Sequence, residues 1–277
     1  MADILSLVFR TFMSHKGVKK DVAVARPSPA CSTLVVGDRS VSRSVLLLAA
    51  VTAASERGMK VMFFTQTPIQ SLPVSLQRCV PSLSPESLKK IKFCYPRTAE
   101  ELLQQVASLH ESSNTSPTPP SLIIVDRLEG FLLGRGGGSH SGSHQSEQSC
   151  AAQLSALLCD TAAFLTQVLE QRASGSAPCR IVASFLSEVD TRQAAGDPSA
   201  TDPILDVLDR YFQVRCTLDE DRGYEAVAAA AQEVWHIYLS GRGITEAFTK
   251  DCEDRPGVAQ EWQLFIFPDG LMEFKMV

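Results

Sequence analysis

The chain has 277 residues, 44% of them hydrophobic and 21% charged, which is long enough to bury one large core or two small ones. A formal net charge of −5 excludes a protein that is basic overall, so any contact with DNA would need local basic patches. The eight cysteines form no C-x-x-C pair, which favours reduced thiols in the cytosol or nucleus and predicts no metal site in this chain. No apolar stretch approaches the roughly 20 residues that span a bilayer, so we expect no membrane contact.

Residues 1–30 begin with a short amphipathic run at 4–13 and then become basic and polar, which predicts a flexible N-terminal tail with room for one or two helical turns. From residue 31, short continuous apolar runs alternate with helical periods. This alternation is typical of a mostly parallel sheet with helices on both faces. The expected strands are 33–36, 61–65, 91–95, 121–125 and 180–185, and the expected helices are 44–57, 84–87, 98–110, 150–172 and 203–211.

The C-terminal part of the chain predicts antiparallel edge strands at 214–217 and 234–239, followed by a hairpin that turns through Pro268-Asp269-Gly270. Apolar residues alternate along this hairpin at Trp262, Leu264, Ile266 and Phe274. We expect a partner to cover that apolar face, because an open sheet edge with apolar side chains is unfavourable in water.

Two segments that follow strands, 127–149 and 188–201, are poor in apolar residues, and 134–148 is especially rich in Gly, Ser and His. Both are expected to be mobile, and both leave the carboxyl ends of strands, where open α/β sheets bind ligands. Their few cations make Arg127, Arg135 and Arg192 the candidate DNA-binding residues. The alternative is that the two segments are plain insertions.

A modified phosphate loop follows the first strand of the predicted sheet. Against the pattern Gly-x-x-x-x-Gly-Lys-Ser/Thr, Gly37 and Ser44 fit, whereas Ser42 and Arg43 replace the second glycine and the lysine. Arg43 keeps the positive charge but is planar and longer than lysine, and Asp38 adds a negative charge that opposes anion binding. The sequence therefore indicates either a degenerate nucleotide site or a strand, turn and helix without nucleotide. The candidate residues are Gly37, Asp38, Arg39, Ser40, Val41, Ser42, Arg43 and Ser44.

A carboxylate, Asp126, ends the apolar strand 121–125. In a phosphate-loop protein, a carboxylate at this place would hold magnesium through water, but a helix N-cap is an equally good interpretation. Glu129, three residues later, is expected to be an exposed loop glutamate, and a general base is the alternative.

Four segments give the chain a family resemblance: Lys-Ile-Lys-Phe-Cys-Tyr-Pro at 90–96, Leu-Leu-Cys-Asp-Thr-Ala-Ala at 157–163, Arg-Tyr-Phe at 210–212, and Glu261-Trp262 with the Asp269-Gly270 hairpin. Over residues 31–277 the chain resembles the RecA-like recombinase paralogues. Within that group it is most similar to the SWIM-type zinc-finger-associated proteins, the ATPase-like subunits of the animal Shu complex. The resemblance implies a single RecA-like P-loop domain over 31–277.

The resemblance also implies a function in homologous-recombination repair of DNA double-strand breaks, in the nucleus. A small SWIM-type zinc-finger protein would be the partner and would hold the metal. The pair would bind single-stranded DNA and support the filament formed by the recombinase and its paralogues.

Three departures from the family bear on catalysis, for which ATP and magnesium are the implied cofactors. Ser42-Arg43-Ser44 replaces Gly-Lys-Thr, Gln66 stands at the place of the catalytic glutamate, and Phe185 or Leu186 replaces a glutamine sensor. A glutamine cannot accept a proton as a general base. We therefore expect weak or absent hydrolysis. The alternatives are an active DNA-stimulated ATPase that uses Arg43 in place of lysine, and a ligand-free interaction subunit.

Overall fold

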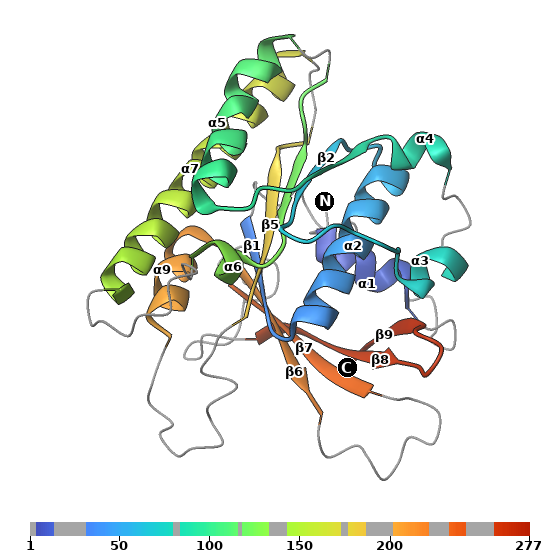
Figure 1. Ribbon diagram of the computed structural model, residues 1–277. Coiled ribbons are helices and arrows are strands. Elements are labelled where there is room, and N and C mark those ends of the chain that lie inside the picture. The colour runs from blue at the N-terminus through green and yellow to red at the C-terminus, as the bar shows by residue number, and fades with distance from the viewer. Residues whose placement is uncertain are drawn as a thin grey trace, which may run out of the picture.

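The computed structural model describes residues 4–13, 32–79, 84–115, 118–132, 143–172, 177–186, 202–221, 233–241 and 258–277. These residues build a nine-stranded sheet in the order β3-β2-β4-β5-β1-β6-β7-β8-β9 (Figure 1). The strands are β1 (Ser32–Val36), β2 (Val61–Phe64), β3 (Ile91–Cys94), β4 (Leu122–Val125), β5 (Arg180–Phe185), β6 (Val214–Glu220), β7 (Glu233–Gly241), β8 (Val258–Ile266) and β9 (Met272–Met276).

The first six strands in sequence run parallel to one another, and β6 to β9 form antiparallel pairs. This arrangement confirms the predicted fold class. One detail differs, because β6 was expected to be an antiparallel edge strand. It pairs in parallel with β1 and antiparallel with β7, so it joins the two halves of a continuous sheet.

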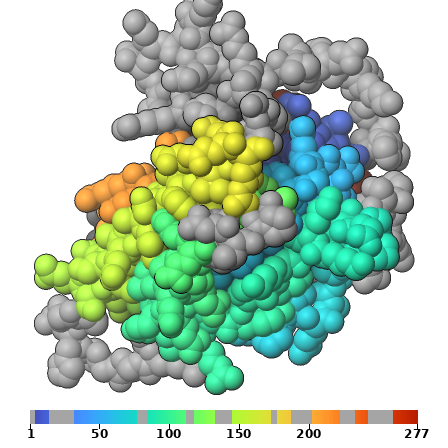
Figure 2. Space-filling model, turned by 90° about the horizontal axis from the view of Figure 1, so that it is seen from above, coloured from blue at the N-terminus to red at the C-terminus, as the bar shows by residue number. Residues whose placement is uncertain are grey.

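Helices cover the two faces of the sheet and create two cores. One core contains residues of α1 (Ile4–Thr11), α2 (Arg39–Glu56), α3 (Val74–Cys79) and α4 (Pro85–Leu88). The other contains residues of α5 (Ala99–Thr115), α6 (Leu128–Leu132), α7 (Ser143–Arg172) and α9 (Pro203–Tyr211). Figure 2 shows α5 and α7, in green and yellow-green, on one side of the molecule, with the blue and teal segments on the other. The central strands supply apolar side chains to both cores, which explains their uninterrupted apolar sequences.

Segment 127–149 was expected to be mobile, but α6 covers 128–132 and α7 begins at Ser143, so the expectation is wrong for those residues. Residues 133–142 and the second segment expected to be mobile, 188–201, lie outside the described residues. Over Gln145–Arg172, α7 is long and apolar enough to cross a membrane by length and composition alone. Its Leu154, Leu158 and Leu165 are buried in the second core, however, which is the packing of a core helix.

Helix α1 forms the two helical turns that the sequence allowed, but it is buried against the sheet, so the prediction of a flexible tail is wrong for residues 4–13; residues 14–31 lie outside the described part of the chain. Its Phe9 is fully buried, with ring centroids 4.8 Å from Phe274 and 5.5 Å from Trp262. The amide of Phe274 also donates a hydrogen bond to the carbonyl of Phe12. The chain's own N-terminal helix thus covers the apolar face that was assigned to a partner, because burial of these aromatic rings stabilises the helix in place.

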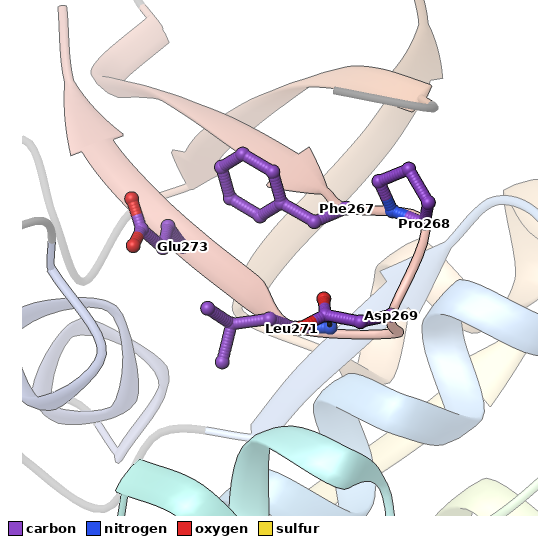
Figure 3. Close-up of a pocket in the computed structure, with 5 residues that line it drawn as sticks. All are labelled: Phe267, Pro268, Asp269, Leu271 and Glu273. Atoms are coloured by element: carbon purple, nitrogen blue, oxygen red, sulfur yellow. Dashed lines mark hydrogen bonds between the residues drawn. The ribbon is translucent and has the colours of Figure 1, made fainter. Parts of the chain in front are cut away.

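The turn between β8 and β9 carries an open hollow of about 360 Å³ (Figure 3). Phe267, Pro268, Asp269, Leu271 and Glu273 line it, and all five belong to this one hairpin. None of the residues that follow the parallel strands takes part. The hollow is therefore a surface feature of the hairpin, separate from the site predicted by the sequence.

Candidate functional site

The predicted phosphate loop is largely helical. Helix α2 begins at Arg39, directly after Gly37 and Asp38, so most of segment 37–44 forms its first turns. Asp38 is the N-cap, and its Oδ1 accepts hydrogen bonds from the amides of Ser40 (2.7 Å) and Val41 (3.3 Å). Partial burial alone would raise the pKa of Asp38, but the hydrogen bonds from Ser40 and Val41 outweigh it and lower that pKa. A carboxylate therefore occupies the end of the helix where a phosphate would bind in a P-loop protein.

Gly37 serves a close contact between strands. Its φ angle is +151°, and a Cβ atom placed on it would lie 2.7 Å from Cβ and 2.9 Å from the carbonyl oxygen of Leu218 on β6. Its amide donates to the carbonyl of Phe185 at the end of β5. The glycine that fitted the phosphate-loop pattern is thus required by packing against β6.

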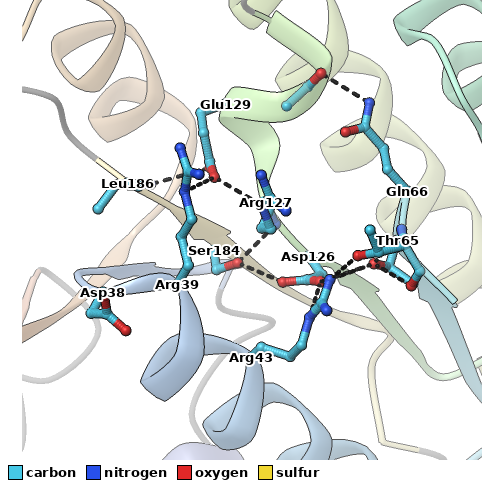
Figure 4. Close-up of polar contacts among 12 residues, drawn as sticks. Asp38, Arg39, Arg43, Thr65, Gln66, Asp126, Arg127, Glu129, Ser184 and Leu186 are labelled. Atoms are coloured by element: carbon cyan, nitrogen blue, oxygen red, sulfur yellow. Dashed lines mark hydrogen bonds and ion pairs between the residues drawn. The ribbon is translucent and has the colours of Figure 1, made fainter. Parts of the chain in front are cut away.

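Arg43 and Asp126 form the central ion pair of the site (Figure 4). Nε and Nη2 of Arg43 lie 2.8 and 2.7 Å from Oδ2 of Asp126. The carboxylate is completely buried at the end of β4, whereas the Arg43 side chain is 28% exposed. Nη2 of Arg43 also donates to the hydroxyls of Thr65 (3.2 Å) and Thr67. A guanidinium group therefore neutralises the carboxylate that was predicted to hold magnesium.

Two further hydroxyl groups complete the surroundings of Asp126. Thr65 donates to Oδ2 at 2.9 Å, and Ser184 on β5 donates to Oδ1 at 3.4 Å. Ser184 in turn accepts from the amide of Arg127 at 2.9 Å. A buried carboxylate is stable only when its oxygens are hydrogen-bonded and its charge is paired, and both conditions are met here.

Glu129 forms a second ion-pair cluster beside the first. It was expected to be an exposed loop glutamate, but it lies on α6 and is 3% exposed, so that expectation is wrong. Its Oε1 is 3.3 Å from Nε of Arg127 and 3.7 Å from Nε of Arg39, and its Oε2 accepts from the amide of Leu186 at 3.2 Å. The carboxylate holds three elements together and is not free to act as a base.

Gln66, at the expected place of a catalytic glutamate, has a structural contact. Its Nε2 donates to the carbonyls of Gly130 (2.9 Å) and Arg97 (3.2 Å). An ionised glutamate has no hydrogen to donate, so it could not make these two bonds. The amide joins α6 to the segment between β3 and α5.

The two remaining serines of the pattern, Ser42 and Ser44, have no hydroxyl group available for a phosphate or a magnesium ion. Ser42 is buried, and its hydroxyl has no hydrogen-bond partner among the described residues. Ser44 donates to the carbonyl of Ser40 within the helix. With Asp38 on the helix N-terminus and Arg43 on Asp126, the residues in this arrangement do not fit a magnesium-bound phosphate chain.

Of the three candidate DNA-binding residues, only Arg127 lies in the described part of the chain. It has a left-handed backbone with φ of 64°, and its side chain is paired with Glu129. Arg135 and Arg192 fall outside the described residues. Sequence reasoning missed Thr65, Thr67 and Ser184, because isolated hydroxyl residues at strand ends carry no pattern.

Strand order and the helices on both faces define a RecA-like fold, in which a capped helix stands in place of the phosphate loop. A KaiC-like protein from the archaeon Pyrococcus horikoshii OT3 has a similar structure, with a TM-score of 0.51 and 10% identity over 90% of each chain. At that identity the likeness shows the fold alone.

Sequence comparison identifies the family. No protein-family model matches the chain. The mouse protein named ATPase SWSAP1 is 38% identical over 189 residues, which cover 68% of this chain and 58% of the mouse protein. The human protein of the same name is 31% identical over 196 residues, or 70% of this chain and 74% of the human protein. The chain spans less than two thirds of its mouse relative. It belongs to the SWSAP1 family, which confirms the resemblance seen in its sequence.

Proposed function

We propose that this protein is an accessory factor in homologous-recombination repair of DNA double-strand breaks. It forms a heteromer with a small SWIM-type zinc-finger protein in the nucleus, and the pair binds single-stranded DNA and supports the recombinase filament. Membership of the SWSAP1 family and the RecA-like fold support this proposal. Any zinc in the complex belongs to the partner.

The Arg43–Asp126 ion pair is the observation that carries the proposal of an accessory function without ATP turnover. A P-loop ATPase uses a lysine and a magnesium ion to neutralise its phosphates. Here the lysine is replaced, the magnesium-binding carboxylate is neutralised by the replacing residue, and Gln66 stands where a general base is needed. The ATP site is therefore degenerate, and the protein acts through binding.

DNA binding by the complex should depend mainly on phosphate contacts, because the candidate residues are arginines and few aromatic side chains accompany them. The test is the affinity of the purified complex for a fluorescent oligo-dT over a series of salt concentrations. Arg135→Ala with Arg192→Ala should lower the log-log salt slope by roughly 0.7 for each lost phosphate contact. Arg57→Ala, at the exposed far end of α2, is the matched control. An unchanged slope in the double variant would place the DNA surface elsewhere.

An active DNA-stimulated ATPase is the competing function, favoured by the retention of Asp126 at the end of β4. Phosphate release by the complex with saturating single-stranded DNA separates the two. We expect the same background rate for the wild type and for Asp126→Asn. DNA-dependent turnover that is lost in Asp126→Asn would establish the ATPase instead.

A further inference from the structure

The site contains both kinds of charge that a bound nucleotide would bring. The Asp38 carboxylate accepts the amides at the N-terminus of α2, as a phosphate oxygen does in a P-loop. The Arg43 guanidinium binds Asp126, in the place of a divalent cation. Arg39 and Arg43 lie one helical turn apart on α2, and each faces one of the two buried carboxylates that follow β4.

We propose that these internal charges act as permanent substitutes for the phosphate and the metal, and hold the site in a single state that does not respond to nucleotide. This inference deepens the part of the proposed function that concerns the degenerate ATP site and rests on it; it does not depend on DNA binding. Arg43 pairs with Asp126, and Arg39 and Arg127 both pair with Glu129. Asp38 is held instead by the amides at the N-terminus of α2. Entry of a magnesium-bound phosphate chain would have to separate Arg43 from the completely buried Asp126 carboxylate, which is strongly unfavourable.

The same network holds the points at which two segments leave the sheet. Asp126 accepts from Ser184, and Ser184 accepts from the amide of Arg127, the first residue after β4 and Asp126. Glu129 accepts from the amide of Leu186, the first residue after β5. In a protein that responded to nucleotide, the hydrogen bonds of these two amides would change when the nucleotide bound. Here they are fixed by side chains of the chain itself.

The first test is thermal unfolding of the full chain with and without millimolar magnesium-ATP or magnesium-ADP. A ligand that binds only the native state raises Tm. Because we expect neither nucleotide to bind, the Tm of the wild type should not change. A saturable rise of Tm with either nucleotide would overturn the proposal.

The second test removes the ion pair by Arg43→Gln, by Asp126→Asn and by both together. Arg43→Gln should lower Tm by roughly 5–10 °C, because it leaves a buried carboxylate without its counter-charge. The double variant should lose less than the sum of the two single variants, because it leaves neither charge unpaired. Arg57→Gln, on the exposed end of the same helix, should leave Tm unchanged. Additive losses, or no loss in Arg43→Gln, would show that the pair does not hold the site.

Hydrogen exchange at the amides of Arg127 and Leu186 gives a third measurement that needs neither DNA nor a partner. In the wild type, exchange at both amides should be the same with and without magnesium-ATP. Asp126→Asn should speed exchange at the amide of Arg127 more than at the amide of Leu186, because the acceptor of Leu186 is Glu129. Nucleotide-dependent exchange at either amide would contradict the proposal. Failure of the complex to bind single-stranded DNA would overturn the proposed function and leave this result unaffected.

Discussion

Two regions of this molecule are stabilised in opposite ways. At the carboxyl ends of β4 and β5, two buried carboxylates are held by arginines, hydroxyl groups and backbone amides (Figure 4). In the antiparallel extension formed by β7, β8 and β9, stability comes from apolar packing, in which Phe9 of α1 lies against Trp262 and Phe274. In the first region, arginine side chains of the same chain occupy the place of a ligand. In the second, a helix of the same chain occupies the place of a partner protein.

The comparison shows that the chain supplies its own occupant in both places. A side chain four residues into α2 takes the place of a metal ion, and an N-terminal helix takes the place of a partner. The energetics differ, because apolar burial is nearly insensitive to pH and salt, whereas paired charges depend on the protonation of their carboxylates. Substitutions in the two regions should therefore differ in size and in their dependence on conditions.

The largest effect should come from the apolar region. Phe9→Ala removes a fully buried ring between Trp262 and Phe274, so it should lower the free energy of unfolding by about 3–5 kcal/mol. Urea denaturation followed by Trp fluorescence measures it. Thr11→Ala, on the exposed side of the same helix, is the control and should cost far less. Equal effects of the two substitutions would mean that α1 is not a part of the core.

A glycine substitution tests whether Gly37 serves packing. Gly37→Ala forces a Cβ to within 2.7 Å of Leu218 at a φ angle of +151°, which should cost about 2–4 kcal/mol. Gly58→Ala is the matched control, since its φ is +64° and its nearest neighbour is the flexible end of Lys90 at 3.5 Å. It should cost only about 1 kcal/mol. If the two variants unfold at the same denaturant concentration, the close approach of β6 is not what requires Gly37.

The second carboxylate of the charged region offers an intermediate effect. Glu129→Ala leaves the amide of Leu186 without its acceptor and removes the carboxylate that Arg39 and Arg127 share, so it should cost about 1–3 kcal/mol. Both arginines are partly exposed and can be hydrated, which keeps the loss below that of Phe9→Ala. Glu56→Ala, exposed near the end of α2, provides the comparison in the same denaturation experiment. A Glu129→Ala protein as stable as Glu56→Ala would be inconsistent with the observed cluster.

The smallest effect should depend on pH. Asp38→Ala removes the N-cap of α2 and should cost about 1 kcal/mol at neutral pH. Because the pKa of Asp38 is lowered in the folded protein, its contribution is present above its unfolded pKa of about 3.8 and is lost as pH falls through the lower folded value. The difference in Tm between wild type and Asp38→Ala should therefore shrink below about pH 4. A difference that stays constant down to pH 3 would show that the charge of Asp38 is not involved.

Much of the fold follows from local patterns. Continuous apolar runs such as 122–125 and 180–185 specify buried parallel strands, and the Pro268-Asp269-Gly270 turn specifies the hairpin of β8 and β9. The partition between parallel and antiparallel strands was not local. β6 reads like the strands that follow it, and only its pairing with β1 places it in the parallel half.

The site was predicted in part. The pattern drew attention to Gly37, Arg43 and Asp126, and these residues do lie around the start of α2 and the end of β4. Their roles could not be read from the sequence, because a glycine that fits a phosphate loop and one that fits against Leu218 look the same. Glu129 was misjudged for a related reason. A charged residue in a polar segment is usually exposed, and only the two arginines brought to it by α2 and by the end of β4 make its burial favourable.

The sequence by itself determined which segments form strands and helices and to which family the chain belongs, because apolar periodicity and a few specific segments are local properties. The tertiary structure decided which residues pair with Asp126 and which cover the apolar face of the C-terminal hairpin. Arg43 reaches Asp126 across 83 positions of the chain, and Phe9 reaches Trp262 and Phe274 from the opposite terminus. Such contacts depend on strand order and on the direction of side chains in three dimensions, so no local pattern contains them.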